Sequence, residues 1–523
     1  MNDSTGQSST PSNTPTTEEL QDEMLRVWPA ARLHWSRFLL LAEPTHNNEQ
    51  QSIAQIHLVS RQVSLNFPII QEKNLIGSLE ALLAHEIGHH VRYPGSLSVQ
   101  ARMRMLERSL LPFENFSLIN LFTDLMINEH LGHKLRDQLV AVYQAFTGEG
   151  AFHEKDKQEI NPSFLFYMAI YEELWRMPPG SLMGPYWESF ADSFPGYRAE
   201  AQVLSQDVFH LGPNIYTQFL YFLSVLTRYL VMEGEDPQSG SPYECDCDDP
   251  SPDDWADSLR PTAAEQEAIR RAIEKGWFTK SDEDRLKDLS DIEERIANLP
   301  GFGTQDAEFV PEVMAAYYRQ EAERYLFRPP PQRRLGEAVV PTTIEEWEPG
   351  DAVRDIDWLS TLLERGDVLG AAQPLKRDRI AEYEGQEVNL WQPRMEIYLD
   401  VSGSMPDPRR AINAMTLASQ ILLMGTIRAG GWVRALIYSH SPVLFWEWSR
   451  SEIELSRFLM HYVGGGTDFP FAVLDRSVQE CRRDQPIRVI ISDTDFDHNY
   501  QAAPQNAEHF LEAVQSGPHT ILL

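Results

Sequence analysis

The sequence has very little cysteine, which limits how the fold can be stabilised. Its 523 residues include three cysteines, Cys245, Cys247 and Cys481. Such sparse usage supplies no disulfide framework and favours a reducing cytoplasm. Cys245 and Cys247 could ligate a metal, but one intervening residue is an awkward spacing and no matching pair follows. We therefore interpret both as solvated thiols in an acidic loop.

Basic residues and long apolar runs are also scarce. The chain has 45 Lys and Arg against 78 Asp and Glu, a formal net charge of -33, which disfavours a nucleic-acid interface because that needs clustered cations. The most apolar stretch, residues 215–232, contains polar residues and falls short of the roughly 20 apolar residues of a bilayer span. We predict a buried helix there and no membrane partner. Residues 1–17 have neither a basic segment nor an apolar core, so they predict a disordered tail and not a signal peptide.

Periodicity and composition divide the rest of the chain. Apolar residues recur at helical spacing in the N-terminal half, whereas short β-rich runs alternate with helices near the C-terminus. The predicted fold class is multidomain: a mainly α-helical N-terminal domain and a C-terminal α/β doubly wound (Rossmann-like) domain with a parallel sheet. The predicted segments are a tail (1–17), a helical domain (18–235), an acidic linker (236–261), a helical segment (262–330), an extended connector (331–390) and the α/β domain (391–523).

Oxygen-bearing side chains gather at predicted strand ends in the C-terminal domain. They lie at or just after the ends of the strands at 394–400 and 488–493, and after the glycine loop at 464–466. Ligands bind outside the carboxyl ends of strands in an open parallel sheet, so these side chains are expected to lie together. Hydroxyl and carboxylate oxygens suit Mg²⁺ or Mn²⁺. The predicted ligands are Asp400, Ser402, Ser404, Thr467 and Asp493.

This pattern resembles the metal-ion-dependent adhesion site of the von Willebrand factor A family, which reads D-x-S-x-S, then T, then D. The resemblance implies that the Ser and Thr hydroxyls bind the metal directly and that at least one Asp acts through water. It also implies that a Glu or Asp of a protein partner completes the coordination. We interpret Asp495 and Asp497, just beyond the motif, as loop acids. Family members usually continue through a sixth strand and a closing helix, whereas this sequence stops at the fifth predicted strand, residues 520–523.

The N-terminal domain carries a zinc motif on an amphipathic predicted helix, His85-Glu86-Ile-Gly-His89. Histidines at i and i+4 lie on one helical face, so both can ligate one Zn²⁺. Glu86 lies between them, where it can take a proton from an attacking water. The metzincin continuation would require Gly at position 92 and His at position 95. The chain has Arg92 and Gly95, which excludes that class.

The third zinc ligand is predicted on the apolar helix at residues 116–133. Its polar exceptions, Asn120, Asp124 and Asn128, recur every four residues and form one stripe on a buried helix. Burying three polar groups is costly unless they are paired, and a metal with its surroundings would pair them. We therefore predict Asp124 as the third ligand, with Asn120 and Asn128 orienting the site.

Other choices of third ligand remain open. Glu129 is the second choice because it lies about 140° round the helix from Asp124. His130 and His133 are the third choice. In a purely structural alternative, the polar stripe only packs against a polar interior.

H-E-x-x-H followed by an N-x-x-x-D-x-x-x-N helix resembles a metallopeptidase domain found upstream of von Willebrand-type domains in some bacterial proteins. The resemblance covers roughly residues 20–235, and its specific part is the two helices. It implies a zincin-like fold more firmly than it implies an activity.

The connector contains W-E-P-G-D-A-V-R-D-I-D-W, which resembles a signature of bacterial proteins encoded beside MoxR-type AAA+ ATPases. The resemblance implies an AAA+ ATPase as partner. Pro349–Asp351 predicts a turn, and we expect Trp358 to anchor the connector on the C-terminal domain. Arg354 could form an ion pair with Asp355 or Asp357, which contributes little if it is exposed.

Two functions follow from these motifs. In the first, the chain is a cytoplasmic zinc metallopeptidase acting on a protein or peptide, and its C-terminal domain is a metal-dependent adaptor for a partner such as a MoxR-type AAA+ ATPase. In the second, the chain is a non-catalytic binding protein whose H-E-x-x-H site is structural or inactive. Adhesion at a cell surface is a distant third, because neither an export signal nor a disulfide is expected.

Overall fold

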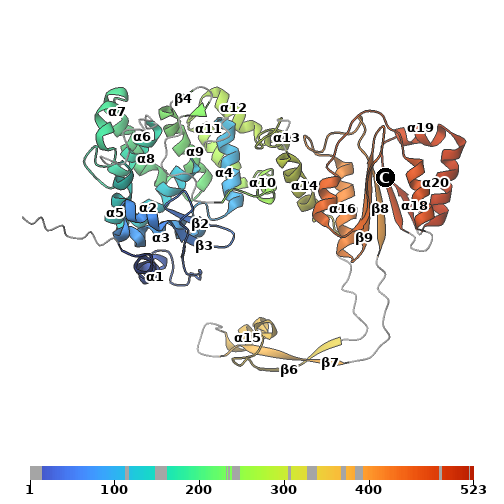
Figure 1. The fold of residues 1–523 in the computed structure, drawn as a ribbon, viewed down its shortest axis with the longest axis horizontal. Helices are drawn as coiled ribbons and strands as arrows, with labels where there is room; N and C mark the ends of the chain where they lie inside the picture. Colours follow the sequence, from blue (N-terminus) through green and yellow to red (C-terminus); the bar gives the residue numbers. More distant parts are fainter. Residues whose placement is uncertain are drawn as a thin grey trace, which may run out of the picture. The chain divides into compact units, whose positions relative to one another are not determined.

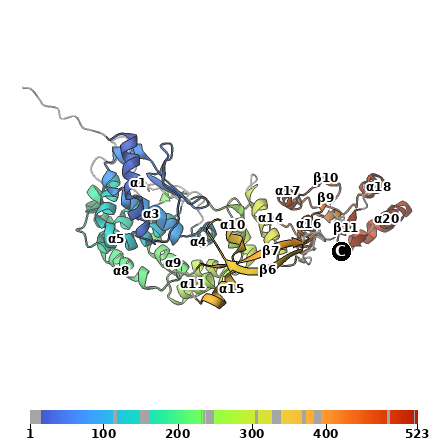
Figure 2. The same cartoon turned by 90° about the horizontal axis from the view of Figure 1, so that it is seen from below.

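The chain forms two compact units, seen in a computed structural model. The first comprises Met1–Tyr318 with Pro406–Asn413, and the second comprises Arg319–Met405 with Ala414–Leu523. Figures 1 and 2 show their elements. The structure describes residues 15–111, 117–147, 162–230, 232–233, 236–237, 248–303, 308–326, 338–366, 373–382, 393–481, 486–517 and 519–523. Cys245 and Cys247 lie outside these ranges.

The first unit is mainly helical. Its helices are α1 (Thr17–Leu33), α2 (Phe67–Glu72), α3 (Leu79–Val91), α4 (Leu97–Leu110), α5 (Ile119–Thr147), α6 (Pro162–Leu174), α7 (Trp187–Ser193), α8 (Tyr197–His210), α9 (Ile215–Leu226), α10 (Pro252–Ser258), α11 (Ala263–Glu274), α12 (Lys280–Asp288) and α13 (Ile292–Ala297). Short 3₁₀ turns are η1 (Ile76–Ser78), η2 (Gly184–Tyr186) and η3 (Thr227–Tyr229). A small sheet of β1 (Thr45–His46), β2 (Ala54–His57) and β3 (Gln62–Leu65) has the order β1-β3-β2, and β4 (Met232–Glu233) pairs with β5 (Asp236–Pro237).

The acidic linker predicted at residues 236–261 ends in folded structure. Asp248 Oδ2 accepts the Leu58 N–H at 2.7 Å, which ties this region to the turn after β2. Ser251 caps α10 in a capping box, and Ser98 on α4 donates to Asp254 Oδ1 at 2.8 Å. A cap residue followed by proline at the first helical position starts a helix even in acidic sequence.

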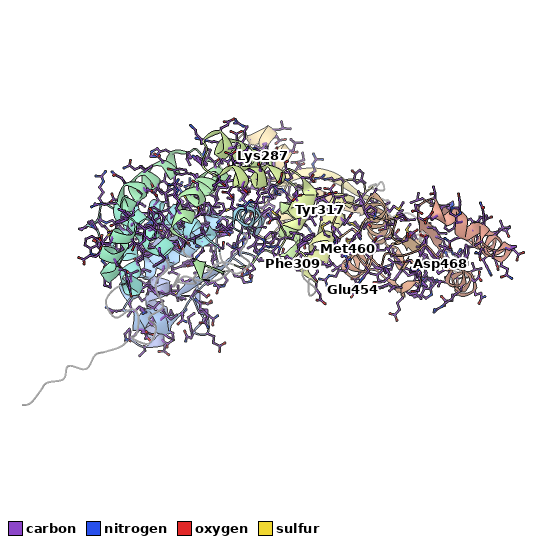
Figure 3. The ribbon with its side chains drawn as sticks, turned by 90° about the horizontal axis from the view of Figure 1, so that it is seen from above. Lys287, Phe309, Tyr317, Glu454, Met460 and Asp468 are labelled. Carbon is purple, nitrogen blue, oxygen red and sulfur yellow. The ribbon has the colours of Figure 1, made fainter. Side chains whose placement is uncertain are left out.

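The helical segment predicted at residues 262–330 is not a separate body in its first part. Glu265 on α11 accepts Arg102 of α4 at 2.7 Å and Arg295 of α13 at 3.0 Å. Glu265 and Arg295 are fully buried, so the three helices share one interior. The next helix, α14 (Phe309–Ala322), begins in the first unit and ends in the second. Its Phe309 and Tyr317, labelled in Figure 3, contact Trp255 and the Arg260 guanidinium.

The second unit contains a five-stranded mixed sheet with the order β10-β9-β8-β11-β12. Its strands are β8 (Arg394–Asp400), β9 (Trp432–Tyr438), β10 (Val443–Ser449), β11 (Ile487–Ile491) and β12 (Thr520–Leu522). Its helices are α16 (Ala414–Arg428), α17 (Glu452–Phe458), α18 (Phe471–Glu480), α19 (Asp495–Gln501) and α20 (Pro504–Ser516). Figure 1 shows α16 on one side of the sheet and α18, α19 and α20 on the other.

Alternation along the strands supplies a core on each face of the sheet. Ile397 and Leu399 of β8 belong to one buried cluster, with residues of α16 and α17. Tyr398, between them, belongs to the other cluster, with residues of α18, α19 and α20. Successive strand residues point to opposite faces, so a central strand covered by helices on both sides is mostly apolar. The buried Glu396 is an exception in β8 and pairs with Arg434 and Arg488.

The sheet is mixed, whereas the sequence analysis predicted a parallel sheet. The strands β9, β8, β11 and β12 run parallel to one another, but β10 is antiparallel to β9. Residues 439–442 are the only link between β9 and β10. A parallel crossover needs a dozen or more residues, so this short link forces a hairpin.

The connector predicted at residues 331–390 contains a hairpin and a helix. The strands β6 (Ala338–Glu346) and β7 (Leu375–Glu382) are antiparallel, and η4 (Val353–Asp355) and α15 (Trp358–Arg365) lie between them in sequence. Asp357 caps α15 and pairs with Arg377, which differs from the pair with Arg354 that we expected. Trp358 is half exposed, so its expected role as a buried anchor is not seen.

Within the described ranges, the structure contains no helix with the length and apolar character that a membrane crossing requires.

Candidate metal-binding sites

Close packing of α3 against α5 brings the N-terminal motif to the polar stripe. The Cα of Gly88 faces α5, and a Cβ there would lie 2.6 Å from Trp35 Cζ2 and 2.8 Å from Ile127 Cγ2. The Trp35 indole donates to Ala84 O at 2.7 Å, which fixes the ring against α3. The glycine inside H-E-x-x-H therefore permits the approach that the site needs.

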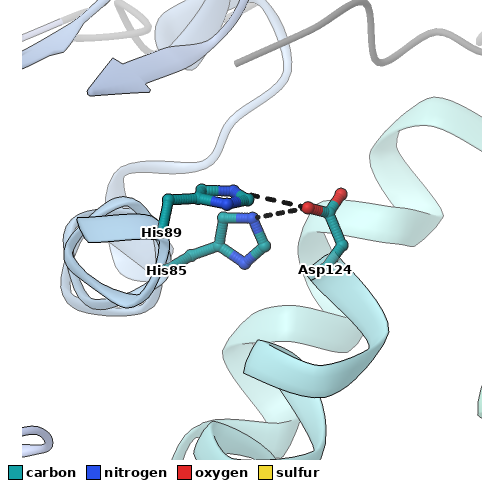
Figure 4. A group of neighbouring side chains, drawn as sticks. All are labelled: His85, His89 and Asp124. Atoms are coloured by element: carbon teal, nitrogen blue, oxygen red, sulfur yellow. Dashed lines mark ion pairs between the residues drawn. The ribbon is translucent and has the colours of Figure 1, made fainter. Parts of the chain in front are cut away.

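Two histidines and one carboxylate converge between these helices (Figure 4). His85 Nε2 and His89 Nε2 each lie 3.4 Å from Asp124 Oδ1, and the ligand atoms of all three residues lie within 4.8 Å of one another. Two ligands of one tetrahedral Zn²⁺, each about 2.0–2.1 Å from it, lie about 3.3–3.4 Å apart. Both observed separations match this spacing and exceed the length of an ordinary hydrogen bond.

The atoms that face the centre of this group are buried and unsatisfied. Among the residues that the structure describes, His89 Nε2 and Asp124 Oδ1 have no hydrogen-bond partner. His89 is fully buried, and Asp124 is 5% exposed. A buried polar atom without a partner is costly, and a bound ion is one of the arrangements that removes the cost. The donor set of two imidazoles and one carboxylate fits zinc with an open fourth position.

The outer nitrogens of both histidines have partners. His85 Nδ1 lies 2.8 Å from Asn128 Oδ1, and His89 Nδ1 lies 2.9 Å from the Tyr93 carbonyl oxygen. An oxygen acceptor at Nδ1 requires that nitrogen to carry a proton, so a neutral imidazole in this position keeps its lone pair on Nε2, where a metal can bind.

Electrostatics within the group favour an ionised carboxylate. Burial alone would raise the pKa of Asp124, but the two histidines lower it to about 2. Burial alone would also lower the pKa of His85, but Asp124 outweighs it and raises that pKa to about 10. Burial lowers the pKa of His89, against the attraction of Asp124. A metal ion that binds here therefore has to displace a proton from His85.

The other predicted residues of this region take different positions. Glu86 is 2% exposed, and its charge is close enough to His85 to raise that pKa. Asn120 lies one turn before Asp124, and its Nδ2 is buried with no hydrogen-bond partner among the described residues, so no orienting contact is seen for it. Glu129 lies 3.6 Å from the exposed His133, and His130 bonds His34 O and stacks on Trp35. These alternative ligands stay outside the His85–His89–Asp124 group.

The C-terminal candidates meet where β8 and β11 end. Ser402 Oγ lies 3.1 Å from Ser404 Oγ, and Ser404 Oγ donates to Asp493 Oδ2 at 2.6 Å. Neighbouring ligands of octahedral Mg²⁺, each about 2.1 Å from it, lie about 3.0 Å apart. The two serine hydroxyls already have this spacing, so they could share one magnesium ion.

Both oxygens of Asp400 hold neighbouring groups. Its Oδ1 accepts the Ser402 N–H at 2.9 Å, and its Oδ2 accepts the Ser492 hydroxyl at 2.6 Å. Asp400 is 1% exposed. Its carboxylate shapes the serine turn, an arrangement suited to contact with a metal through water.

Thr467 comes from a glycine loop that hydrogen bonds to the serine turn. The Gly403 N–H donates to Gly465 O at 2.8 Å, and the Gly464 N–H donates to Val401 O at 2.9 Å. Asn499 on α19 donates to Thr467 O at 2.7 Å. The backbones of the two loops therefore meet, although no contact of the Thr467 hydroxyl with the other candidates is seen.

Two further residues brace this loop from the end of β9. The Ser439 hydroxyl donates to Gly464 O, and His440 Nε2 accepts the Gly466 N–H at 3.1 Å. The N–H of Asp468, labelled in Figure 3, donates to Ser439 O at 2.8 Å. Asp495 and Asp497 were expected in a loop, but the structure places both in the first turn of α19, where they are exposed.

Sequence reasoning missed several supporting residues at both sites. Ser492 could have been found because it precedes Asp493 at a strand end. No local signal in the sequence marks Asn499, Ser439 or Tyr93, because their roles depend on contacts made by other segments.

Comparisons of the chain with protein-family models, curated proteins and solved structures return no match.

Proposed function

We propose that the first unit is a zinc-dependent peptidase, and that the second unit contains a von Willebrand factor A-type domain that recruits a partner through a divalent metal. The convergence of His85, His89 and Asp124, with unsatisfied buried atoms facing one point, carries the proposal. The proposal includes the fold classes. The helical first unit supports a zincin-like fold, and the sheet with helices on both faces supports a doubly wound fold.

His85, His89 and Asp124 would hold the zinc. The ion would supply Lewis acidity toward a peptide carbonyl and would make a water molecule more acidic. Glu86 lies on the same helix, between the two histidines, and would take the proton from the attacking water and deliver it to the leaving amine. Its burial keeps it away from bulk solvent, which favours proton exchange with a group inside the site.

Metal analysis and one isosteric substitution test the enzyme. The purified chain should hold about one zinc per first unit, because His85, His89 and Asp124 form one group of three ligands. Glu86→Gln should keep the zinc and abolish cleavage of a mixed peptide library. Glu129→Gln is the matched control, because Glu129 lies outside the ligand group, and it should keep both properties.

Three results would count against the peptidase. They are a chain without zinc, cleavage retained by Glu86→Gln, and iron in place of zinc after anaerobic purification. Two histidines with one carboxylate also form the ligand set of non-haem iron sites, so the identity of the metal is informative. Zinc bound without cleavage of any peptide would favour the alternative of a non-catalytic binding protein.

The C-terminal cluster would hold Mg²⁺ or Mn²⁺ through Ser402, Ser404 and Thr467. The aspartates would act partly through water, and a carboxylate of the partner would complete the coordination. The hydrogen bonds among Ser402, Ser404 and Asp493 support this arrangement. The connector signature favours a MoxR-type AAA+ ATPase as the partner.

A pull-down with such an ATPase tests the adaptor. Binding should require Mg²⁺, and Asp400→Ala should abolish it because the Ser402 N–H and the Ser492 hydroxyl both lose their acceptor. Asp497→Ala, an exposed acid on α19, is the control and should bind normally. Binding that survives Asp400→Ala or chelation of Mg²⁺ would reject the adaptor.

A further inference from the structure

A buried amide beside the N-terminal site is held by two tyrosines. Asn128 Nδ2 lies 2.8 Å from the Tyr143 hydroxyl and 3.0 Å from the Tyr171 hydroxyl. Its Oδ1 lies 2.8 Å from His85 Nδ1. Asn128 is 1% exposed and Tyr171 is fully buried, so bulk water is kept from this amide.

The amide has two orientations with opposite consequences for His85. Once His85 has lost one proton to become a neutral ligand, Oδ1 toward the ring keeps the remaining proton on Nδ1 and leaves Nε2 with the lone pair that a metal requires. With the NH₂ group toward the ring, Nδ1 becomes the acceptor and Nε2 carries the proton instead. Nearly equal shapes make the two orientations hard to separate by packing alone, so hydrogen bonding has to choose between them.

The tyrosine hydroxyls supply that choice. An amide NH₂ group has two hydrogens, and the two hydroxyl oxygens can accept both of them. The Tyr167 hydroxyl lies 2.9 Å from the Tyr171 hydroxyl and can accept the Tyr171 proton. A Tyr171 hydroxyl that donates to Tyr167 has no proton left for the amide and acts toward it only as an acceptor.

We propose that Tyr143 and Tyr171 are positioning residues that hold the Asn128 carbonyl toward His85 and thereby keep His85 Nε2 as the metal-binding nitrogen. The inference rests on the proposed zinc site, but it concerns a layer of residues that do not touch the metal. It gives the tyrosine hydroxyls a role beyond the packing of α5 and α6.

Zinc affinity in two backgrounds tests the proposal. The double variant Tyr143→Phe/Tyr171→Phe should bind zinc more weakly by roughly 10–100-fold, the range typical when a partner of a metal-ligating histidine is lost. Asn128→Asp should bind zinc well, because either carboxylate oxygen can accept from Nδ1. In the Asn128→Asp background the same two Tyr→Phe changes should reduce zinc affinity by only a small fraction of that factor. A carboxylate presents an acceptor oxygen to His85 Nδ1 in either orientation.

A purely structural role of the tyrosines gives a different result. It predicts the same loss of affinity in both backgrounds, and that outcome would overturn the proposal. Tyr229→Phe is the control, since it removes the buried hydroxyl that donates to Glu200 at 3.1 Å without touching the site. Its zinc affinity should equal that of the unaltered chain.

Affinity is measured by competition with a chromophoric chelator on the full chain. Circular dichroism of each variant shows whether it is folded. If the double variant is not folded, Tyr171→Phe alone replaces it.

A chain that binds no zinc at all would reject the proposed function. Zinc bound equally well with and without the hydroxyls would reject only the role of the tyrosines. In zinc-loaded protein, the ¹⁵N resonances of His85 should show a protonated Nδ1, and a proton on Nε2 would contradict the proposal.

Discussion

The two candidate metal sites differ in whether their buried polar atoms have hydrogen-bond partners. At the N-terminal site, His89 Nε2 and Asp124 Oδ1 are buried and have no hydrogen-bond partner among the described residues. At the C-terminal site, Ser404 bonds Asp493, and Asp400 bonds a backbone N–H and a hydroxyl. The first arrangement is incomplete without an ion, whereas the second is already a connected network. We therefore expect zinc to be structural as well as catalytic, and Mg²⁺ to exchange readily.

Chelation should separate the two sites most strongly. A ligand present at about 1,000 times its Kd stabilises the folded state by about 4 kcal/mol, and one at about 10 times its Kd by about 1.4 kcal/mol. Zinc removal should therefore lower the unfolding temperature of the first unit far more than Mg²⁺ removal lowers that of the second. Differential scanning calorimetry with a zinc-selective chelator and then with EDTA measures both. Equal shifts would end the contrast between the sites.

Gly88→Ala should damage the N-terminal site alone. The new Cβ would meet Trp35 and Ile127 at under 3 Å, and overpacking of this kind costs about 1–3 kcal/mol. The helices must separate, so zinc affinity should fall with stability. Gly77→Ala is the matched control, because a Cβ there has nothing within 4 Å. A Gly88→Ala chain with unaltered zinc binding would show that close packing of α3 on α5 is not what assembles the ligands.

Zinc affinity should keep rising with pH through neutral pH and beyond it. Asp124 raises the pKa of His85 to about 10, so His85 holds a proton through the neutral range in metal-free protein. Binding then releases one proton, and zinc affinity should rise about tenfold per pH unit through neutrality. An isolated histidine would give a plateau above about pH 6.5. Titrations at several pH values measure the slope, and a plateau near pH 7 would contradict it.

Asn499→Ala should have the smallest effect, confined to the C-terminal site. The Asn499 side chain donates to Thr467 O and accepts the Phe469 N–H at 3.0 Å. Each such hydrogen bond contributes about 1 kcal/mol, and because part of the loss falls on the loop that carries Thr467, Mg²⁺ affinity should fall several-fold. Isothermal titration calorimetry measures it, with the exposed His498→Ala as control. A change in zinc affinity would mean that the two sites are coupled.

Local patterns in the sequence were enough to predict the elements that carry the sites. The spacing of His85 and His89 indicated one helical face, and the four-residue repeat of Asn120, Asp124 and Asn128 indicated the facing helix. Both helices are present, and the strands after which Asp400 and Asp493 stand are also present. Periodicity works here because it reports which side of an element is buried.

Features that depend on distant partners could not be predicted. The direction of β10 follows from the length of a four-residue link, and the start of α10 in acidic sequence follows from a cap and from its contact with Ser98. In the Asn128–Tyr143–Tyr171 group, Asn128 lies 15 positions before Tyr143 and 43 positions before Tyr171. No window of neighbouring residues contains such information, since it exists only after the helices pack.

The anchoring of Asp248 has a consequence for how the first unit behaves when its chain is cut. Tyr229 is buried at one end of the segment 230–248, and Asp248 is bonded to Leu58 at the other. The Arg102–Glu265–Arg295 group then joins the two halves again. A protease that cleaves between Tyr229 and Asp248 should therefore leave two fragments that co-elute in gel filtration. The same two pieces, made as separate polypeptides, should reassemble into one zinc-binding body.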